Sequence, residues 1–480
     1  MLKRLSHKLH RRFPAGVALL CSVCLFFCDS LFLSAEELSN EERLELQREM
    51  PVQTNEIVNW PVGPIVSADA AILMEADTGT ILYAKNIHKK EYPASTTKLL
   101  TTLMATELCS LDEVVTFSHD AVFDNPPGSS GIAMDVGQTL TMEQCLNAIL
   151  IRSANEVSFA VAEHITGTTD WSVFADLMNE RAEELGCLNS HFVNPNGLPD
   201  ENHYTTAYDL AMIGRAFFAN EMLCRISLTR RLEIPASDTI PVTKIENSSM
   251  KIIPGGTYAY PYLVGCKTGY TEAARSCLVS CAERDGMKLI CAVMRDEDPL
   301  QYEDTISLFD YGFSNFTKVN VAQTETKYTM SDIDLFYGGT DIFGSTRQLL
   351  TLSKDDYIVL PRTTSFEDVD SAISYDTETE DWVALIRYTY HGADIGSVRV
   401  SFTAGSDSTV FGEMEPMLSA EEKEDDSPVI YVNLVRILTA AAGILGALLL
   451  FLLIRIPLRN YSFSFGSRRA WKKDRKRRRR

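Results

Sequence analysis

Hydrophobic and polar positions recur along the chain with the periods of strands and helices. Apolar runs at 68–74 and 81–84 flank the turn residues Asp77-Thr78-Gly79, a pattern that predicts a β-hairpin. Two further strands are expected at 276–283 and 288–295. Helix-spaced apolar residues predict the following helices: 95–108, 141–152, 156–165, 170–185, 206–218 and 301–313. Strands at both ends with helices between them predict an α+β domain whose terminal segments share one antiparallel sheet.

The same pattern divides the whole chain into segments. We expect a signal peptide at 1–35, a linker at 36–64, the α+β domain at 65–316, a small all-β domain at 317–412, an acidic spacer at 413–428, one C-terminal transmembrane helix at 429–454 and a basic tail at 455–480. The linker is polar and proline-rich, whereas 317–412 consists of short β-rich runs separated by turn residues.

Both ends of the chain carry membrane-related signals. A basic start leads into an apolar run at 15–35 followed by Glu36-Glu37, which is the layout of a secretory signal peptide cleaved after Ala35, with an uncleaved anchor as the alternative. Residues 437–454 contain no charge, and a helix of that length nearly spans the hydrocarbon core. The basic residues that follow indicate a cytoplasmic C-terminus, so residues 36–436 are expected outside the cell membrane.

Composition narrows the possible functions. The formal net charge of -20 argues against a general nucleic-acid partner, and the basic tail is better explained by contact with anionic lipid. Eight cysteines follow the signal segment, and their spacing shows neither a CxxC pair nor a zinc site. We therefore predict small core residues in place of disulfides, and we expect no metal and no cofactor.

Three short motifs could carry chemistry. Ser95 and Lys98 are three apart at a helix start, so the amine can reach the hydroxyl and accept its proton. Ser153-Ala154-Asn155 is a polar break between two apolar helices, and Lys267-Thr268-Gly269 precedes a strong strand. Each motif alone also fits a structural role, as a helix cap, a turn or a solvated charge. Their order along one exported chain favours a catalytic role.

In that order the motifs resemble those of the serine penicillin-binding proteins, and among them the low-molecular-mass D-alanyl-D-alanine carboxypeptidases of peptidase family S11. The stretches 126–130, 194–199 and 203–209 resemble the same family, over roughly residues 64–316. The resemblance implies the β-lactamase and penicillin-binding-protein transpeptidase fold. It also implies an enzyme that removes the terminal D-alanine from peptidoglycan stem pentapeptides and is acylated by β-lactam antibiotics such as penicillin.

The resemblance assigns a role to each motif residue. Ser95 attacks the penultimate D-Ala carbonyl, Lys98 is the base, and Ser153 passes a proton to the leaving nitrogen. A neutral Lys98 requires a lowered pKa, which burial and a nearby second cation would produce. The implied substrate-binding residues are Asn155, Lys267, Thr268, Gly269 and Tyr270. Gly269 would let the sheet edge approach the substrate, and the backbone N–H groups of Ser95 and Tyr270 would form the oxyanion hole.

The sequence departs from the family pattern at Glu156-Val157 and Arg275-Ser276, so the finer substrate contacts are open. Two alternatives keep the same fold: a penicillin-binding sensor or scaffold without turnover, and a DD-endopeptidase or β-lactamase. The E-x-x-L-N loop with which class A β-lactamases position their deacylating Glu is absent after the second motif, so slow release of penicillin is expected.

Overall fold

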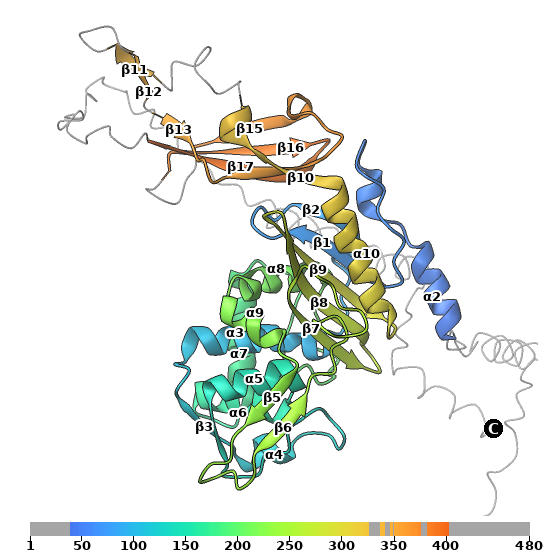
Figure 1. The fold of residues 1–480 in the computed structure, drawn as a ribbon, viewed down its shortest axis with the longest axis vertical. Helices are drawn as coiled ribbons and strands as arrows, with labels where there is room; N and C mark the ends of the chain where they lie inside the picture. The colour runs from blue at the N-terminus through green and yellow to red at the C-terminus, as the bar shows by residue number, and fades with distance from the viewer. Residues whose placement is uncertain (1–38, 326–336, 341–345, 349, 376–381, 403–480) are drawn as a thin grey trace, which may run out of the picture. The chain divides into compact units, whose positions relative to one another are not determined.

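A computed structural model describes residues 39–325, 337–340, 346–348, 350–375 and 382–402. Its central element is a five-stranded antiparallel sheet in the order β2-β1-β9-β8-β7 (Figure 1). The strands are β1 (Ala70–Glu75), β2 (Ile81–Lys85), β7 (Leu263–Thr271), β8 (Arg275–Arg284) and β9 (Met287–Asp296). β1 pairs with β9 along its whole length, so the two ends of the α+β domain share one sheet, as predicted.

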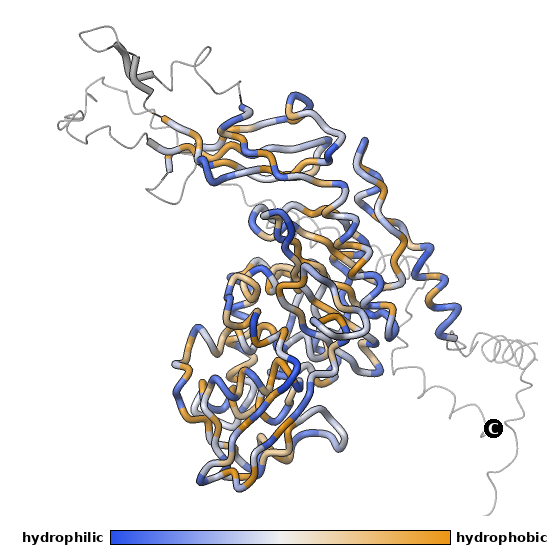
Figure 2. Tube along the Cα trace, viewed as in Figure 1, coloured by the Kyte–Doolittle hydropathy of each residue, from blue (hydrophilic) through white to orange (hydrophobic). Residues whose placement is uncertain are grey.

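Alternation along the strands separates two apolar clusters, one on each face of the sheet. Ile72 and Met74 of β1 join the cluster formed with α8 (Ala207–Phe218), whereas Ala71 and Leu73 join the cluster formed with α10 (Leu300–Asn315). The first cluster also contains residues of five further helices, which are α3 (Lys98–Leu108), α5 (Met142–Arg152), α6 (Asn155–Thr166), α7 (Trp171–Glu184) and α9 (Glu221–Ser227). Figure 2 shows apolar stretches along these strands and helices.

Local sequence signals explain where several helices begin and end. Thr141 and Gln144 form the predicted capping box at the start of α5, and Thr206 caps α8 through the backbone N–H of Asp209. Gly186, with φ +85°, follows the end of α7. The first turn of the helix predicted at 95–108 is the 3₁₀ helix η2 (Ala94–Thr97). Several other short elements were not predicted: η1 (Gln53–Glu56), β3 (Val114–Thr116), α4 (His119–Phe123), β4 (Thr139–Thr141), β5 (Arg231–Ile234) and β6 (Lys244–Asn247).

The prediction of a linker at 36–64 is wrong, because part of this segment folds onto the domain. Residues 40–49 form helix α2 (Asn40–Glu49), which is largely hydrophilic in Figure 2. Its buried Gln47 donates a hydrogen bond to the Arg295 carbonyl, and Arg43 pairs with Glu297. Trp60 is buried and donates to the Leu82 carbonyl over 2.9 Å. Polar contacts hold α2 in place, so the hydrophobic pattern gave no sign of it.

Residues 316–402 are β-rich, as expected. A four-stranded sheet has the order β13-β17-β16-β15, and β10 pairs with β14. The described strands and helices of this segment are β10 (Phe316–Asn320), α11 (Val321–Thr324), β11 (Tyr337–Thr340), β12 (Thr346–Gln348), β13 (Leu350–Leu352), β14 (Tyr357–Pro361), η4 (Phe366–Asp368), β15 (Asp370–Ser374), β16 (Ala384–Tyr390) and β17 (Ala393–Phe402). Phe316, Ile358 and Tyr388 belong to the same apolar cluster as Trp60 and Leu73, so this segment shares a core with the five-stranded sheet.

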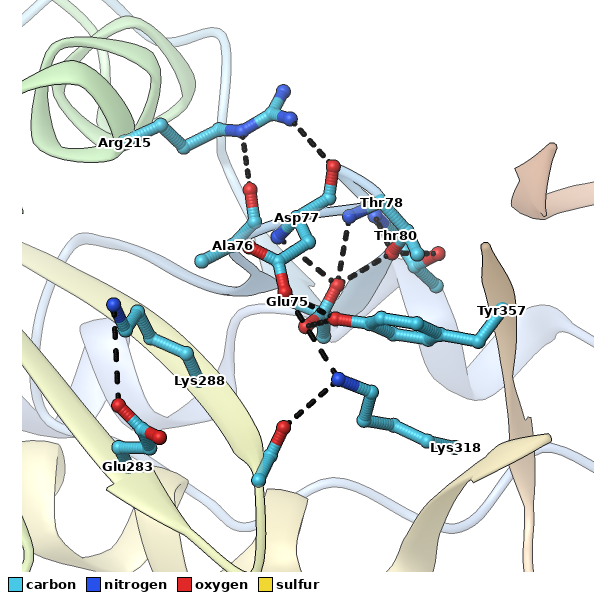
Figure 3. A network of polar contacts seen from close by, with 11 residues as sticks. Glu75, Ala76, Asp77, Thr78, Thr80, Arg215, Glu283, Lys288, Lys318 and Tyr357 are labelled. Atoms are coloured by element: carbon cyan, nitrogen blue, oxygen red, sulfur yellow. Dashed lines mark hydrogen bonds and ion pairs between the residues drawn. The ribbon is translucent and has the colours of Figure 1, made fainter. Parts of the chain in front are cut away.

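A polar network joins the β-rich segment to the β1–β2 turn (Figure 3). The Tyr357 hydroxyl donates to Glu75 Oε1 over 2.8 Å and also contacts the Asp77 carboxylate. The Lys318 ammonium lies 3.3 Å from the centre of the Tyr357 ring. On the other side of the turn, Arg215 of α8 donates to the carbonyls of Ala76 and Asp77. The turn is therefore held from both sides, by α8 and by β14.

The predicted signal peptide, acidic spacer, transmembrane helix and basic tail, at 1–35, 413–428, 429–454 and 455–480, lie outside the described residues. Within the described part of the chain, no helix combines the length and apolarity needed to cross a bilayer. The eight described cysteines are all free, and seven of them are buried, which agrees with their prediction as core residues. Cys109 is the exception, because it is half-buried.

Candidate active site

The turn that carries Ser95 has an uncommon backbone. Ser95 lies in η2, directly after Ala94, whose φ is +48° although it is not glycine. Two side chains fix this strained turn: Thr96 Oγ1 donates to the Pro93 carbonyl, and Thr97 Oγ1 donates to the Ala94 carbonyl. Strain of this kind persists only where the surroundings enforce it, which is common at functional sites.

Lys98 is the first residue of α3 and is completely buried. Its Nζ lies 2.9 Å from Ser95 Oγ, 2.7 Å from Asn155 Oδ1 and 2.6 Å from the Asn196 carbonyl oxygen. A neutral amine has two N–H groups, which the amide and carbonyl oxygens satisfy, so its lone pair is left facing the serine hydroxyl. Burial lowers the pKa of Lys98 well below its usual value, and the charge of Lys267 lowers it further, as the sequence predicted.

Ser153 and Asn155 lie on either side of the break between two helices. Ser153 follows α5 in the left-handed conformation, with φ 58°, and this turn lets its hydroxyl face the β7 strand. Asn155 begins α6 and donates its backbone N–H to the Ser130 carbonyl. The structure places the Asn155 side-chain oxygen on Lys98, so this side chain orients the base in addition to any contact with substrate.

Lys267 is buried within β7, the strand at the edge of the sheet. Its Nζ lies 3.1 Å from Ser153 Oγ and donates to the Thr268 carbonyl over 2.7 Å. Burial lowers the pKa of Lys267 to about 8, so the ammonium is mostly charged at neutral pH. The Tyr270 side chain, further along the strand, is 60% exposed.

Two glycines allow separate segments to approach the Ser95 turn. A Cβ on Gly269 would lie 2.8 Å from the Pro93 carbonyl oxygen and 3.0 Å from the Ser95 nitrogen. A Cβ on Gly197 would lie 1.8 Å from the Ala94 carbonyl oxygen. Gly269 therefore makes room for the nucleophile turn, a role that the sequence did not indicate, and its approach to substrate stays a prediction.

Three supporting residues were not assigned roles from the sequence. Asn196 supplies the carbonyl that binds Lys98, from the loop that the pattern Asn194-Pro-Asn-Gly-Leu-Pro199 marks. His203 Nδ1 accepts from the Val193 N–H, so its Nε2–H donates to Thr97 Oγ1 over 2.9 Å. Glu156 accepts the Ile132 N–H over 2.7 Å, which fixes the loop before the second motif to α6.

These side chains border one cleft of about 600 Å³. It is lined by seven of the eight predicted residues: Ser95, Ser153, Asn155, Lys267, Thr268, Gly269 and Tyr270. Lys98 lies beneath the cleft, behind Ser95. The cleft also reaches Ser276, where the sequence departs from the family pattern, and Asp298 and Gln301, to which the sequence analysis gave no role. The structure thus brings together three motifs that are 58 and 114 residues apart.

A serine hydroxyl against a buried lysine amine, beside a second lysine on a strand edge, defines the class of serine acyl-transfer enzymes that use lysine as base. The family model for D-alanyl-D-alanine carboxypeptidases, Peptidase_S11, matches residues 57–298. The chain belongs to this family, as the motifs predicted.

Individual relatives agree with this assignment. D-alanyl-D-alanine carboxypeptidase DacF of Bacillus subtilis is 33% identical over 52% of this chain and 63% of its own length. DacB2 of Mycobacterium tuberculosis is 30% identical over 55% of this chain and 87% of its own. Among solved structures, penicillin-binding protein 5 of Haemophilus influenzae has a TM-score of 0.57 at 23% identity, covering 72% of this chain and 98% of that one. This last likeness shows the shared penicillin-binding-protein fold.

Proposed function

We propose that this protein is a serine-type D-Ala-D-Ala carboxypeptidase that removes the terminal D-alanine from peptidoglycan stem pentapeptides. Family membership supports this activity, and one observation at the site carries it: Lys98 Nζ lies 2.9 Å from Ser95 Oγ while two other oxygens satisfy its N–H groups. The amine is thereby held as an acceptor for the serine proton.

The geometry supports a sequence of proton transfers. Ser95 Oγ attacks the penultimate D-Ala carbonyl carbon as its proton passes to Lys98 Nζ. The oxyanion that forms would accept hydrogen bonds from the backbone N–H groups of Ser95 and Tyr270, each worth about 3–4 kcal/mol. Ser153 Oγ, 3.1 Å from Lys267 Nζ, then relays a proton to the D-Ala nitrogen, the C–N bond breaks and free D-Ala leaves. Water hydrolyses the ester and releases the shortened peptide.

The charge of Lys267 explains why the enzyme would prefer the C-terminal residue of a peptide substrate. The ammonium of Lys267 and the hydroxyl of Thr268 border the cleft on the sheet edge. A terminal carboxylate in this position would gain charge-assisted hydrogen bonds that an internal peptide bond cannot make. Penicillin carries a carboxylate in the corresponding position, so β-lactam antibiotics are expected to acylate Ser95.

We also propose that the enzyme is exported and anchored in the cell membrane. The basic and apolar start of the sequence, the uncharged run at 437–454 and the basic residues after it support a cytoplasmic C-terminus and an extracellular catalytic domain. The β-rich segment then serves as a spacer between the active site and the bilayer.

The test is D-alanine release from a stem pentapeptide by the full-length chain. Wild type should release D-alanine, whereas Ser95→Ala should not, and Ser365→Ala, a capping residue in the β-rich segment, should behave as wild type. Equal release by wild type and Ser95→Ala would overturn the proposal. Labelling with a fluorescent penicillin separates the β-lactamase alternative from the others, because a β-lactamase would lose its label rapidly.

A further inference from the structure

Three potential metal ligands meet at a surface site remote from the cleft. Cys109 directly follows the last residue of α3, Glu113 lies in the next turn, and His164 lies in the last part of α6. The thiol sulfur, a carboxylate oxygen and an imidazole nitrogen all lie within 4.8 Å of one another. Cys109 packs against the edge of the helical core cluster and is the one described cysteine that is only half-buried.

The site is held in shape by its surroundings. The Ser110 N–H donates to Glu113 Oε1 over 2.7 Å, and His164 Nε2 lies 2.8 Å from Glu113 Oε2. The loop itself is fastened by the Met142 N–H, which donates to the Glu113 carbonyl over 2.8 Å. A hollow of about 370 Å³, bordered by His164 and Thr168, adjoins the imidazole and has room for water. The three ligands therefore need only small side-chain movements to converge.

We propose that Cys109, Glu113 and His164 bind a Zn²⁺-class transition metal ion, with water as the fourth ligand. Thiolate and imidazole donors select a borderline or soft ion over Mg²⁺ and Ca²⁺, which prefer oxygen. Zinc bonds of about 2.0–2.3 Å need donor atoms within about 4 Å of one another, a shift of less than 1 Å here. On binding, the Cys109 thiol gives its proton to solvent, and the Nε2 proton that His164 donates to Glu113 moves to Nδ1, which frees the Nε2 lone pair for the ion.

The ion would join the distal ends of two catalytic helices. α3 begins at Lys98 and ends beside Cys109, and α6 begins at Asn155 and contains His164 near its other end. The same two helices are already joined at the cleft, where Lys98 binds Asn155. A metal at the opposite end would stabilise the folded state without touching the reacting atoms.

Zinc and cobalt titrations of the full-length chain test the site. We expect Zn²⁺ to raise the melting temperature of wild type and Co²⁺ to give the near-ultraviolet absorption of a thiolate–cobalt bond. Cys109→Ser should lose that absorption and bind Zn²⁺ at least tenfold more weakly, since loss of a supporting hydrogen bond alone can cost 10–100-fold. His164→Ala should weaken binding similarly. His119→Ala, which removes an exposed histidine paired with Asp120, is the matched control and should bind as wild type.

Penicillin labelling of each variant reports folding independently of metal. Unchanged zinc affinity and unchanged cobalt absorption in Cys109→Ser would overturn the proposal, because any binding would then come from other groups, such as the cysteines of residues 1–35. The proposal would also be overturned if His119→Ala lost as much zinc affinity and cobalt absorption as Cys109→Ser. Neither result depends on D-alanine release, so failure here is distinct from failure of the proposed activity.

Discussion

Lys267 Nζ lies 3.1 Å from Ser153 Oγ, so the second lysine contacts the residue that is expected to protonate the leaving group. Its pKa of about 8 places its loss of charge just above neutral pH. As pH rises through this value, the site loses its attraction for a carboxylate and the charge that lowers the pKa of Lys98. We therefore expect the rate of acylation by penicillin to fall as pH rises through about 8.

Lys267→Arg tests this assignment. A guanidinium stays charged at high pH, so the alkaline decline should move to higher pH, although the larger side chain should lower the rate at pH 7. Lys288→Arg, on β9 outside the cleft, is the control, and its acylation rate should fall over the same pH range as that of wild type. If the acylation rate of Lys267→Arg fell over the same pH range as that of wild type, the decline would have to come from another titrating group.

Gly269→Ala should reduce acylation without preventing folding. The new Cβ would press on the Pro93 carbonyl and the Ser95 nitrogen, and a displacement of the nucleophile of about 1 Å can cost 10²-fold in rate. We expect a 10–100-fold lower acylation rate. Gly265→Ala is the matched control on the same strand, since its Cβ would meet the side chains of Phe218 and Ser227 instead. It should lower the melting temperature while the folded fraction acylates normally, and equal rates in both variants would contradict this explanation.

His203 should make stability depend on pH. Burial lowers its pKa to about 4 in the folded protein, against about 6.5 unfolded, so the unfolded chain binds the extra proton between these values. His203 contributes on the order of 3 kcal/mol to the free energy of unfolding. This contribution is fully present above pH 6.5 and is lost as pH falls to about 4. His203→Gln retains a hydrogen-bond donor for Thr97. In urea unfolding, its free energy of unfolding should fall less steeply than that of wild type between pH 6.5 and pH 4. Identical pH dependence in wild type and variant would exclude the effect.

Tyr357→Phe should weaken the connection between the β-rich segment and the catalytic sheet. The change removes the hydroxyl from Glu75, a buried carboxylate whose pKa burial already raises, and we expect a loss of about 1–3 kcal/mol in the free energy of unfolding. Tyr375→Phe, at an exposed tyrosine, should have no measurable effect. Chemical denaturation with both variants distinguishes this prediction from a general effect of losing a tyrosine hydroxyl.

Sequence alone predicted the parts of the fold that depend on local signals. The hairpin at Asp77-Thr78-Gly79, the capped start of α5 and the terminal strands all follow from periodicity and turn residues. The three motifs likewise identified the side chains that the cleft brings together.

The rest depends on contacts between distant segments. Helix α2 is held by polar partners in 295–297, so it has no apolar stripe to recognise. The Asn196 carbonyl is a backbone group and therefore has no residue-type signature. Cys109 and His164 are 55 positions apart and meet only because α3 and α6 end on the same side.

The close packing of η2 on β7 has a consequence for solubility. β7 is the last strand of its sheet, and an open strand edge is a template for pairing with another chain. Because Gly269 has no side chain, the Pro93–Ser95 backbone packs within contact distance on the face of β7 beside this edge. Variants that displace the turn should therefore loosen the strand that carries the open edge, so aggregation and loss of acylation are expected to appear together.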